Sequence, residues 1–415
     1  MDRRINPVTS IGMHKVVMGD YYAAAKRAHD EGKLVAWCTG VSPAELLRSF
    51  DVVPVFPENH AAMCGARKVA SYLIEEAEAQ GYSMDLCSYA RIDIGSLLAG
   101  ENTKSPIGGL PKPDFVVAAN ASCVTVQKWY EALGRLWGVP VIVLDIPFNH
   151  NIVDRSGIHP DALGYLVAQM HEMVAFLEQQ TRRKFDYARF QESIALSRQA
   201  AEAWAEALRL CEATPSPLNM FEGFIAMGPI VAARGTPETV KYYQDIRAEV
   251  AERVAQGVAA VPGERFRLFW DNIPLWYRVR ETAEQLAAHG ACVVAATYPQ
   301  SWSFQYLDPD RPFETLAEAL NLVTVNWGVK QRSAKMRQVV QQFACDGLIM
   351  HSARTCKAYF IGQYDIRNAI EREFGVPGLV IDADHTDPRA FSETQVAARI
   401  DAFMESLAAR RPAQV

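Results

Sequence analysis

Short apolar runs with few polar interruptions recur in the first and last thirds of the chain. They lie at residues 34–38, 51–56, 114–122 and 139–147, and again at 265–272, 291–297, 347–352 and 377–384. Such runs, without regular polar alternation, predict strands that are buried on both faces. The segments between them have the composition and spacing of helices. This alternation of strand and helix predicts two parallel sheets, each covered by helices on both faces.

The middle of the chain has a different pattern. Residues 160–260 predict one helix after another, rich in Ala, Glu, Gln and Arg, with breaks at residues 214–217 and 234–237. We therefore predict an α/β fold of two doubly wound parallel-sheet domains separated by a helical insert. The predicted parts are an N-terminal α/β domain with a lead-in helix (1–158), a helical region (159–262) and a C-terminal α/β domain with a closing helix (263–415).

Composition and charge narrow the function classes. The 415 residues are 49% hydrophobic and 22% charged, as in ordinary globular proteins, and the formal net charge is −6. A negative chain is not expected to bind nucleic acid or an anionic membrane surface. No apolar run has the roughly 18 residues that a transmembrane helix requires, and the N-terminal segment lacks the apolar core of a signal peptide. We therefore expect a cytoplasmic protein.

The chain has eight cysteines and no CxxC pair. In the cytoplasm structural disulfides are rare, so each thiol should be buried, catalytic or bound to a metal. Four of them lie in helices or at the strand ends remote from an expected site, and are predicted to be structural: Cys64, Cys211, Cys292 and Cys345. The other four lie at the carboxyl ends of predicted strands or at the starts of helices, where α/β proteins build their active sites: Cys38, Cys87, Cys123 and Cys356.

The spacing of these last thiols bears on the metal they could bind. Tetrahedral zinc sites usually use close CxxC or HxxxH pairs, which this chain lacks. Iron–sulfur clusters accept thiolates from distant segments, and gaps of 36 residues (Cys87 to Cys123) and 233 residues (Cys123 to Cys356) suit a cluster held between two domains. Inert burial remains the alternative for each thiol taken singly.

The segments around these thiols resemble a known family. They are residues 51–62, 81–95, 119–133, 345–384 and 381–405. They resemble the cluster-bearing subunits of ATP-dependent benzoyl-CoA reductases and of 2-hydroxyacyl-CoA dehydratases. The resemblance extends from about residue 33 to the C-terminus, and the cysteine-centred blocks are more specific together than singly.

The resemblance implies a fold and a cofactor. It implies two flavodoxin-like domains that hold one [4Fe-4S] cluster in the cleft between them, with Cys87, Cys123 and Cys356 as ligands. Cys38 would be an extra ligand, an active-site thiol or a packing residue beside the site. A larger double-cubane cluster is a further alternative.

The resemblance also implies an anaerobic reaction on an acyl-CoA and two partner proteins. A separate ATP-hydrolysing activator would supply low-potential electrons, and a paralogous cluster-bearing subunit would complete the enzyme. The chain has no GxxxxGK[ST] motif, so ATP would bind only to the activator. We expect a benzoyl-CoA reductase-type oxidoreductase that reduces an aryl-CoA, because the Ala- and Arg-rich composition and the blocks at 51–62 and 81–95 favour that branch. The alternatives are a 2-hydroxyacyl-CoA dehydratase (a lyase) and an electron-transfer protein without its own substrate.

Five charged or titratable residues near these blocks are candidates for the site. Glu58 and His60 follow a predicted strand and could donate protons to the substrate, with local capping and hydrogen bonding as the alternative. Arg91, Arg354 and Lys357 lie close to cluster cysteines in sequence. They could offset cluster charge or bind CoA phosphates, or they could be ordinary ion-pair partners.

Overall fold

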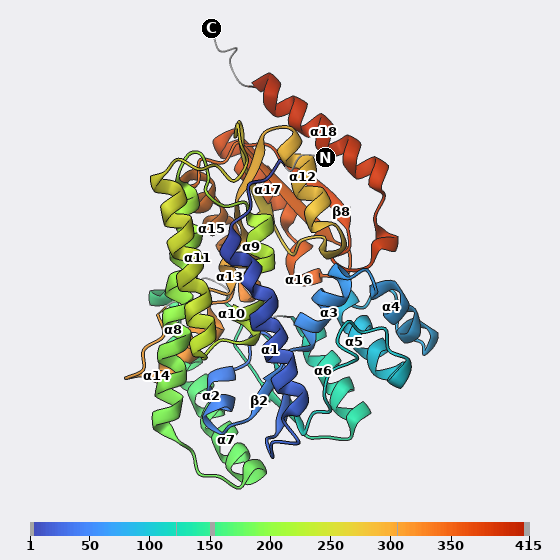
Figure 1. The fold of residues 1–415 in the computed structure, drawn as a ribbon, viewed down its shortest axis with the longest axis vertical. Helices are drawn as coiled ribbons and strands as arrows, with labels where there is room; N and C mark the ends of the chain where they lie inside the picture. The colour runs from blue at the N-terminus through green and yellow to red at the C-terminus, as the bar shows by residue number, and fades with distance from the viewer. Residues whose placement is uncertain (1–3, 122, 150–153, 305, 411–415) are drawn as a thin grey trace.

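The computed structural model describes residues 4–121, 123–149, 154–304 and 306–410, so Ser122 of the predicted strand 114–122 lies outside the described residues. Within these ranges there are two four-stranded parallel sheets, one in each half of the chain (Figure 1). The first sheet has the order β2-β1-β3-β4, with β1 (Val35–Cys38), β2 (Val53–Val55), β3 (Phe115–Ala119) and β4 (Val141–Leu144). The second has the order β6-β5-β7-β8, with β5 (Phe266–Asp271), β6 (Ala291–Ala296), β7 (Gly347–Ala353) and β8 (Gly378–Ala383). Each predicted apolar run coincides with one strand, and the prediction of two doubly wound α/β units is confirmed.

The helices connect the strands and cover the sheets. Those of the first half are α1 (His14–Arg27), α2 (Ala44–Ser49), α3 (Pro57–Ala66), α4 (Ala70–Ala79), α5 (Ser88–Leu98) and α6 (Val124–Trp137). The middle of the chain forms α7 (Pro160–Thr181), α8 (Tyr187–Arg209), α9 (Met220–Ala226), α10 (Gly228–Ala232) and α11 (Pro237–Ala255). The second half contains α12 (Val279–Ala288), α13 (Thr297–Ser301), α14 (Pro312–Asn321), α15 (Val329–Gln342), α16 (Lys357–Phe360), α17 (Gln363–Phe374) and α18 (Glu393–Arg410).

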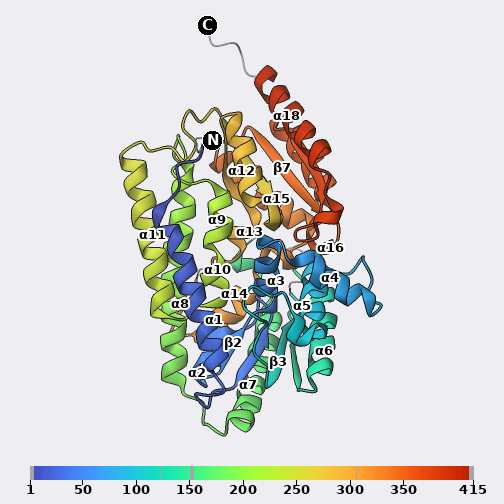
Figure 2. The ribbon, with the colours of Figure 1, turned by 45° about the vertical axis from the view of Figure 1, so that its right-hand side comes forward.

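The middle helices pack against both halves. The predicted breaks fall between α8 and α9 and between α10 and α11. Helices α8 and α11 lie side by side along the length of the molecule, next to α1 (Figures 1 and 2). Helix α7 packs on β4 and α2 on α8, whereas α9 packs on β6. The helical region therefore supplies a covering layer to each sheet.

Side-chain alternation along β1 separates two cores. Ala36 and Cys38 belong to the larger core, whereas Val35 and Trp37 belong to a second core under α3 to α6, as the two-residue repeat of a strand requires. The larger core continues through the middle helices into the second sheet, where it includes Trp270 of β5. One apolar interior thus connects the two halves.

The order of the strands indicates where a ligand would bind. In each sheet the order reverses between two central strands, β1 and β3 in the first sheet and β5 and β7 in the second, so the connections after these two strands run to opposite faces of the sheet. Ligands of doubly wound proteins bind in the crevice that opens at the carboxyl ends of such a pair. Figure 2 shows α3, α5, α13 and α16 in the region between the two sheets.

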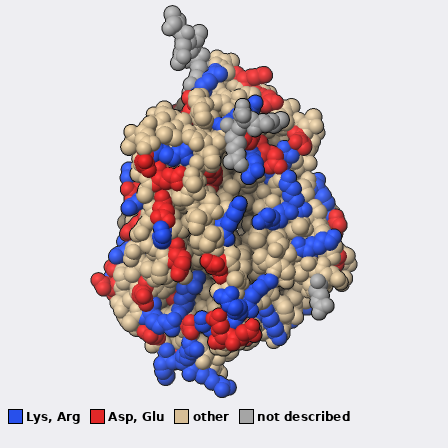
Figure 3. All heavy atoms as spheres, in the orientation of Figure 1, with Lys and Arg blue, Asp and Glu red and all other residues tan. Residues whose placement is uncertain are grey.

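The surface carries both signs of charge. On the face seen in Figure 3, basic and acidic side chains are interspersed. In the described part of the chain, no helix is long and apolar enough to cross a membrane.

Candidate functional site

Cys87, Cys123 and Cys356 are brought together from both halves of the chain. Each residue immediately precedes a helix, α5, α6 and α16 respectively. Burial raises the pKa of the Cys87 thiol, and the charges of the other two thiols raise that pKa further. Cys123 acts in the same way on Cys356, whose pKa is raised to about 12, chiefly by burial. The three cysteines also pack against one apolar core, and the backbone N–H of Ser88 donates to Oγ1 of Thr355 over 3.2 Å, so the segments that carry them lie side by side.

The chemistry of these donors fits an iron–sulfur cluster. Each thiol lies at the start of a helix, where backbone N–H groups of the first turn favour the thiolate. Burial opposes the thiolate more strongly and raises the pKa of all three groups, so a positive partner would have to replace the protons if the thiols were to act as ligands. Among the described residues no group of three or more His, Cys, Asp or Glu side chains is arranged so that it could hold a metal ion. A cubane places each thiolate on a different iron, so its ligands stand farther apart than those of one ion.

Cys38 is not brought to this group. Its side chain is fully buried in the larger core and donates to the carbonyl of Ala36 over 3.3 Å. Burial raises its pKa, and the charges that act on it come from Arg234 and Arg48 rather than from the three thiols. Its contacts are those of a packing residue. The four cysteines predicted to be structural are likewise buried, and none forms a disulfide: Cys64, Cys211, Cys292 and Cys345.

Glu58 is close to the thiols. It lies in the first turn of α3, and its carboxylate accepts a hydrogen bond from the backbone N–H of Gly40, in the loop after β1. Burial raises the pKa of Glu58 to about 7. After burial itself, the charge of Glu58 contributes to the raised pKa of Cys123. Residue 40 must be small, because an added Cβ would lie 2.6 Å from the Trp302 ring and 3.0 Å from Oε2 of Glu58.

His60 lies on the same helix but is turned into the first half. Its Nδ1 is 2.7 Å from Oδ1 of Asp93 and its Nε2 is 2.8 Å from Oγ of Ser105, and the ring is buried. Burial raises the pKa of Asp93 to about 6 in spite of the His60 hydrogen bond. Both ring nitrogens are therefore engaged within the protein, which matches local hydrogen bonding better than proton donation to a substrate.

Arg91 ties the two halves together. Its Nη1 donates to Glu78 on α4 over 2.5 Å and to Asp387, in the loop after β8, over 3.2 Å. Arg389 donates to the same two carboxylates over 2.7 Å each. Arg91 is buried in this four-residue network, which we call the ionic clamp. Its contacts are those of an ion-pair partner.

Arg354 and Lys357 lie on the surface beside Cys356. Arg354 pairs with Asp382 over 2.8 Å, and both side chains are more than half exposed. Lys357 is exposed and donates to the carbonyl of Arg354 over 2.8 Å. Both cations can reach a ligand in solution.

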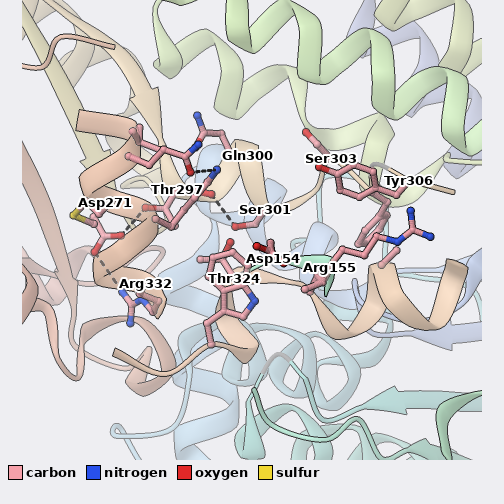
Figure 4. Close-up of a pocket in the computed structure, with 18 of the residues that line it drawn as sticks. Asp154, Arg155, Asp271, Thr297, Gln300, Ser301, Ser303, Tyr306, Thr324 and Arg332 are labelled. Carbon is pink, nitrogen blue, oxygen red and sulfur yellow. Dashed lines mark hydrogen bonds and ion pairs between the residues drawn. The ribbon is translucent and has the colours of Figure 1, made fainter. Parts of the chain in front are cut away.

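A cavity of about 340 Å³ opens at the carboxyl ends of β5 and β6 (Figure 4). Asp271, the last residue of β5, lies at one end of it. Its carboxylate accepts hydrogen bonds from Thr297 over 2.6 Å and from Gln363 over 2.7 Å, and it pairs with Arg332 over 3.5 Å. Asp154, Arg155, Ser303 and Tyr306 line the other end of the cavity in Figure 4.

The cavity adjoins the Cys356 segment. Arg332 donates to the carbonyl of Ala358 over 3.3 Å and lies 5.3 Å from the ring of Tyr359, so one cation contacts both the cavity and α16. Two lining atoms, Oγ of Ser303 and Nε1 of Trp327, are buried without a hydrogen-bond partner in the described structure. A ligand with polar atoms would satisfy them.

No sequence pattern singled out Asp271 or Arg332, the ion pair of this cavity. Asp271 ends the predicted strand 265–272, and a carboxylate at a strand end is a recognisable signal of a site. Arg332 lies within a helix among other polar residues, and only the folded chain shows that it faces Asp271.

Comparisons with known proteins cover nearly the whole chain. Residues 39–407 match the family described as 2-hydroxyglutaryl-CoA dehydratase, D-component. The chain is 32% identical over 397 residues to the (R)-2-hydroxyisocaproyl-CoA dehydratase alpha subunit of Clostridioides difficile, with 95% of each chain covered. It is 31% identical over 391 residues to the (R)-phenyllactyl-CoA dehydratase alpha subunit of Clostridium sporogenes, covering 94% and 93%. Over 422 aligned positions it is 28% identical to a benzoyl-CoA reductase subunit of Thauera aromatica, covering 98% and 96%.

Proposed function

Because the chain belongs to the family of the 2-hydroxyglutaryl-CoA dehydratase D-component, we propose that it is the cluster-bearing subunit of an enzyme that dehydrates a 2-hydroxyacyl-CoA. The convergence of Cys87, Cys123 and Cys356 from both halves carries the proposal. The higher identity to dehydratase alpha subunits than to a reductase subunit supports the choice of reaction. The expectation of a benzoyl-CoA reductase therefore becomes the second candidate.

The three thiolates would hold a [4Fe-4S] cluster and leave one iron without a ligand from this set. When bound, the cluster supplies low-potential electron transfer to the thioester. Glu58, with its pKa near neutrality and its carboxylate positioned by Gly40, can hold and release a proton beside it. The cavity at Asp271 would take the acyl part of the substrate.

Two partners follow from this proposal. An ATP-hydrolysing activator would deliver the electrons, since the chain has no phosphate-binding loop motif of its own. A paralogous chain would complete the enzyme, as the names of the similar proteins, each a subunit of a larger enzyme, suggest. Arg354 and Lys357 would bind phosphates of coenzyme A, and their exposure beside Cys356 supports this role.

Reduction of an aryl-CoA is the second candidate. The 28% identity to a benzoyl-CoA reductase subunit extends over 98% of the chain, so the same fold serves that reaction. Turnover assays with the activator, ATP and both thioester types decide between the two. Loss of water from a 2-hydroxyacyl-CoA supports the first candidate, whereas reduction of benzoyl-CoA supports the second.

The cluster assignment is tested by anaerobic purification with iron and sulfide analysis. We expect about four irons per chain, and their loss in Cys87→Ser, Cys123→Ser and Cys356→Ser. Cys64→Ser is the matched control. Cys64 is also a free, buried thiol but is not one of the three proposed ligands, so this variant should retain its full iron content. Cys38→Ser should also retain its iron if Cys38 only packs. Unchanged iron in all three ligand variants would refute the assignment.

A further inference from the structure

The loop that follows β8 reaches across to the start of α5. His385 of this loop is fully buried, and its Nε2 lies 2.9 Å from Oγ of Ser88 and 3.9 Å from Sγ of Cys87. The ring meets that of Tyr89 edge to face, with 4.4 Å between centroids. A histidine from the second half of the chain therefore contacts a thiol of the first half.

Ser88 is the polar side chain that faces the imidazole. Its Oγ accepts a hydrogen bond from the hydroxyl of Thr386 over 2.6 Å. A hydroxyl oxygen has a second lone pair, so the same Oγ can also accept from Nε2 of His385 over 2.9 Å.

Nδ1 of His385 is buried without a hydrogen-bond partner in the described structure, 3.8 Å from Oδ1 of Asp384. Nε2 is therefore the ring nitrogen that faces hydrogen-bond partners, Ser88 and Cys87.

The loop is held firmly in place. Oδ1 of Asp384 accepts from the backbone N–H groups of Thr386 and Asp387 over 3.0 and 2.9 Å. The carbonyl of His385 accepts from the backbone N–H of Trp276 over 3.0 Å. The position of the imidazole is therefore set by the fold rather than by a freely rotating side chain.

We propose that His385 is a positioning residue that donates its Nε2–H to the sulfur of Cys87, and so makes the cluster easier to reduce. The inference rests on the proposed function, because it concerns Cys87 as a cluster ligand. A hydrogen bond to a ligand sulfur stabilises the more negative, reduced state and raises the reduction potential. His385 acts through Cys87 and has no assigned contact with substrate.

The test compares two variants of the anaerobically purified holoprotein. His385→Leu removes the donor, whereas His385→Gln places an amide N–H at a similar reach. Redox titration followed by electron paramagnetic resonance should show that the leucine variant is harder to reduce by about tenfold in the equilibrium constant, or 59 mV for one electron. The glutamine variant should have a potential close to that of the wild type. His289→Leu is the control. His289 pairs with Asp401 on α18 and has no described contact with Cys87, so its loss should leave the potential unchanged.

A spectroscopic signature separates this role from a merely structural one. In protein labelled with 15N-histidine, the reduced cluster should show a weak nitrogen coupling that is absent in His385→Leu and unchanged in His289→Leu. Absence of that coupling in the wild type would contradict the inference.

The outcomes also separate this inference from the proposed function. Wild-type protein without iron would refute the proposed function itself. Iron-loaded wild type whose potential is unchanged in His385→Leu would refute only the role of His385, as would equal shifts in the leucine and glutamine variants. If His385→Leu loses its iron, the test depends on His385→Gln. Iron and a wild-type potential in His385→Gln support the inference, whereas loss of iron in that variant overturns it.

Discussion

At the scale of residues, burial distinguishes side chains that look equivalent in sequence. Glu58 and His60 lie two positions apart on α3, yet one approaches the thiols and the other is locked to Asp93 and Ser105. Cys38 ends one strand of the first sheet and Cys123 follows another, yet only Cys123 joins the group. Because these differences depend on which way each side chain points, strand and helix boundaries alone do not determine them.

The raised pKa of Glu58 predicts a pH-dependent stability. In the unfolded chain Glu58 should ionise at its ordinary pKa of about 4.5, but in the folded chain only near 7. Between these values the folded state binds more protons, so this residue costs stability increasingly as the pH rises. We expect the melting temperature of Glu58→Gln to rise relative to wild type from pH 5 to 7 and the gap to stay constant above. A gap that does not change over this range would contradict the prediction.

At the scale of elements, the strands were predictable and the contacts between helices were not. Val- and Ile-rich runs identify β3 and β4 because a buried parallel strand needs little more than apolar β-branched side chains. The pairing of Arg91 with Asp387 joins residues 296 positions apart, and no local pattern encodes it. Helix starts and strand ends are local features, and they selected four thiols, including Cys38. The resemblance to the family reduced these to three, whereas His385 and Asp271 acquire their roles only from distant neighbours.

The contact between α4 and α5 gives a prediction at this scale. An added Cβ at Gly95 would lie 1.7 Å from the carbonyl oxygen of Leu73, so Gly95→Ala must push the two helices apart. We expect a loss of about 3 kcal/mol in the free energy of unfolding and lower iron content, because Cys87 immediately precedes α5.

The matched control for that substitution is Gly19→Ala on the exposed side of α1. An added Cβ there meets nothing within 4 Å. Replacing this helical glycine should stabilise the protein by about 0.5–1 kcal/mol. Urea unfolding measures both changes, and equal effects of the two alanines would contradict the packing argument.

At the scale of the whole molecule, the ionic clamp predicts how strongly the halves depend on each other. Arg91→Met would leave Glu78 and Asp387 paired with Arg389 alone. Breaking a buried pair outright costs about 3–5 kcal/mol, so the remaining cation should keep the loss below that range. The variant should unfold more easily and lose iron. Where it retains iron, its KM for the acyl-CoA should be unchanged, because Arg91 contacts protein carboxylates.

Arg27→Met provides the control for the clamp. Arg27 pairs with Glu31 at the surface over 3.4 Å, and such exposed pairs contribute between about 0 and 1 kcal/mol. A KM increase in Arg91→Met at normal stability would instead favour the alternative that Arg91 binds CoA phosphate.

The shared apolar interior also limits how the molecule can move. Hinged enzymes open and close by rotating two separately packed lobes about a few loop residues. Here the larger core continues from β1 through the middle helices to β5. Rotating one half of the chain relative to the other would therefore expose side chains that are now fully buried. We therefore expect the region that holds the thiols to keep its width. In the proposed enzyme, large motions driven by ATP hydrolysis would then belong to the activator.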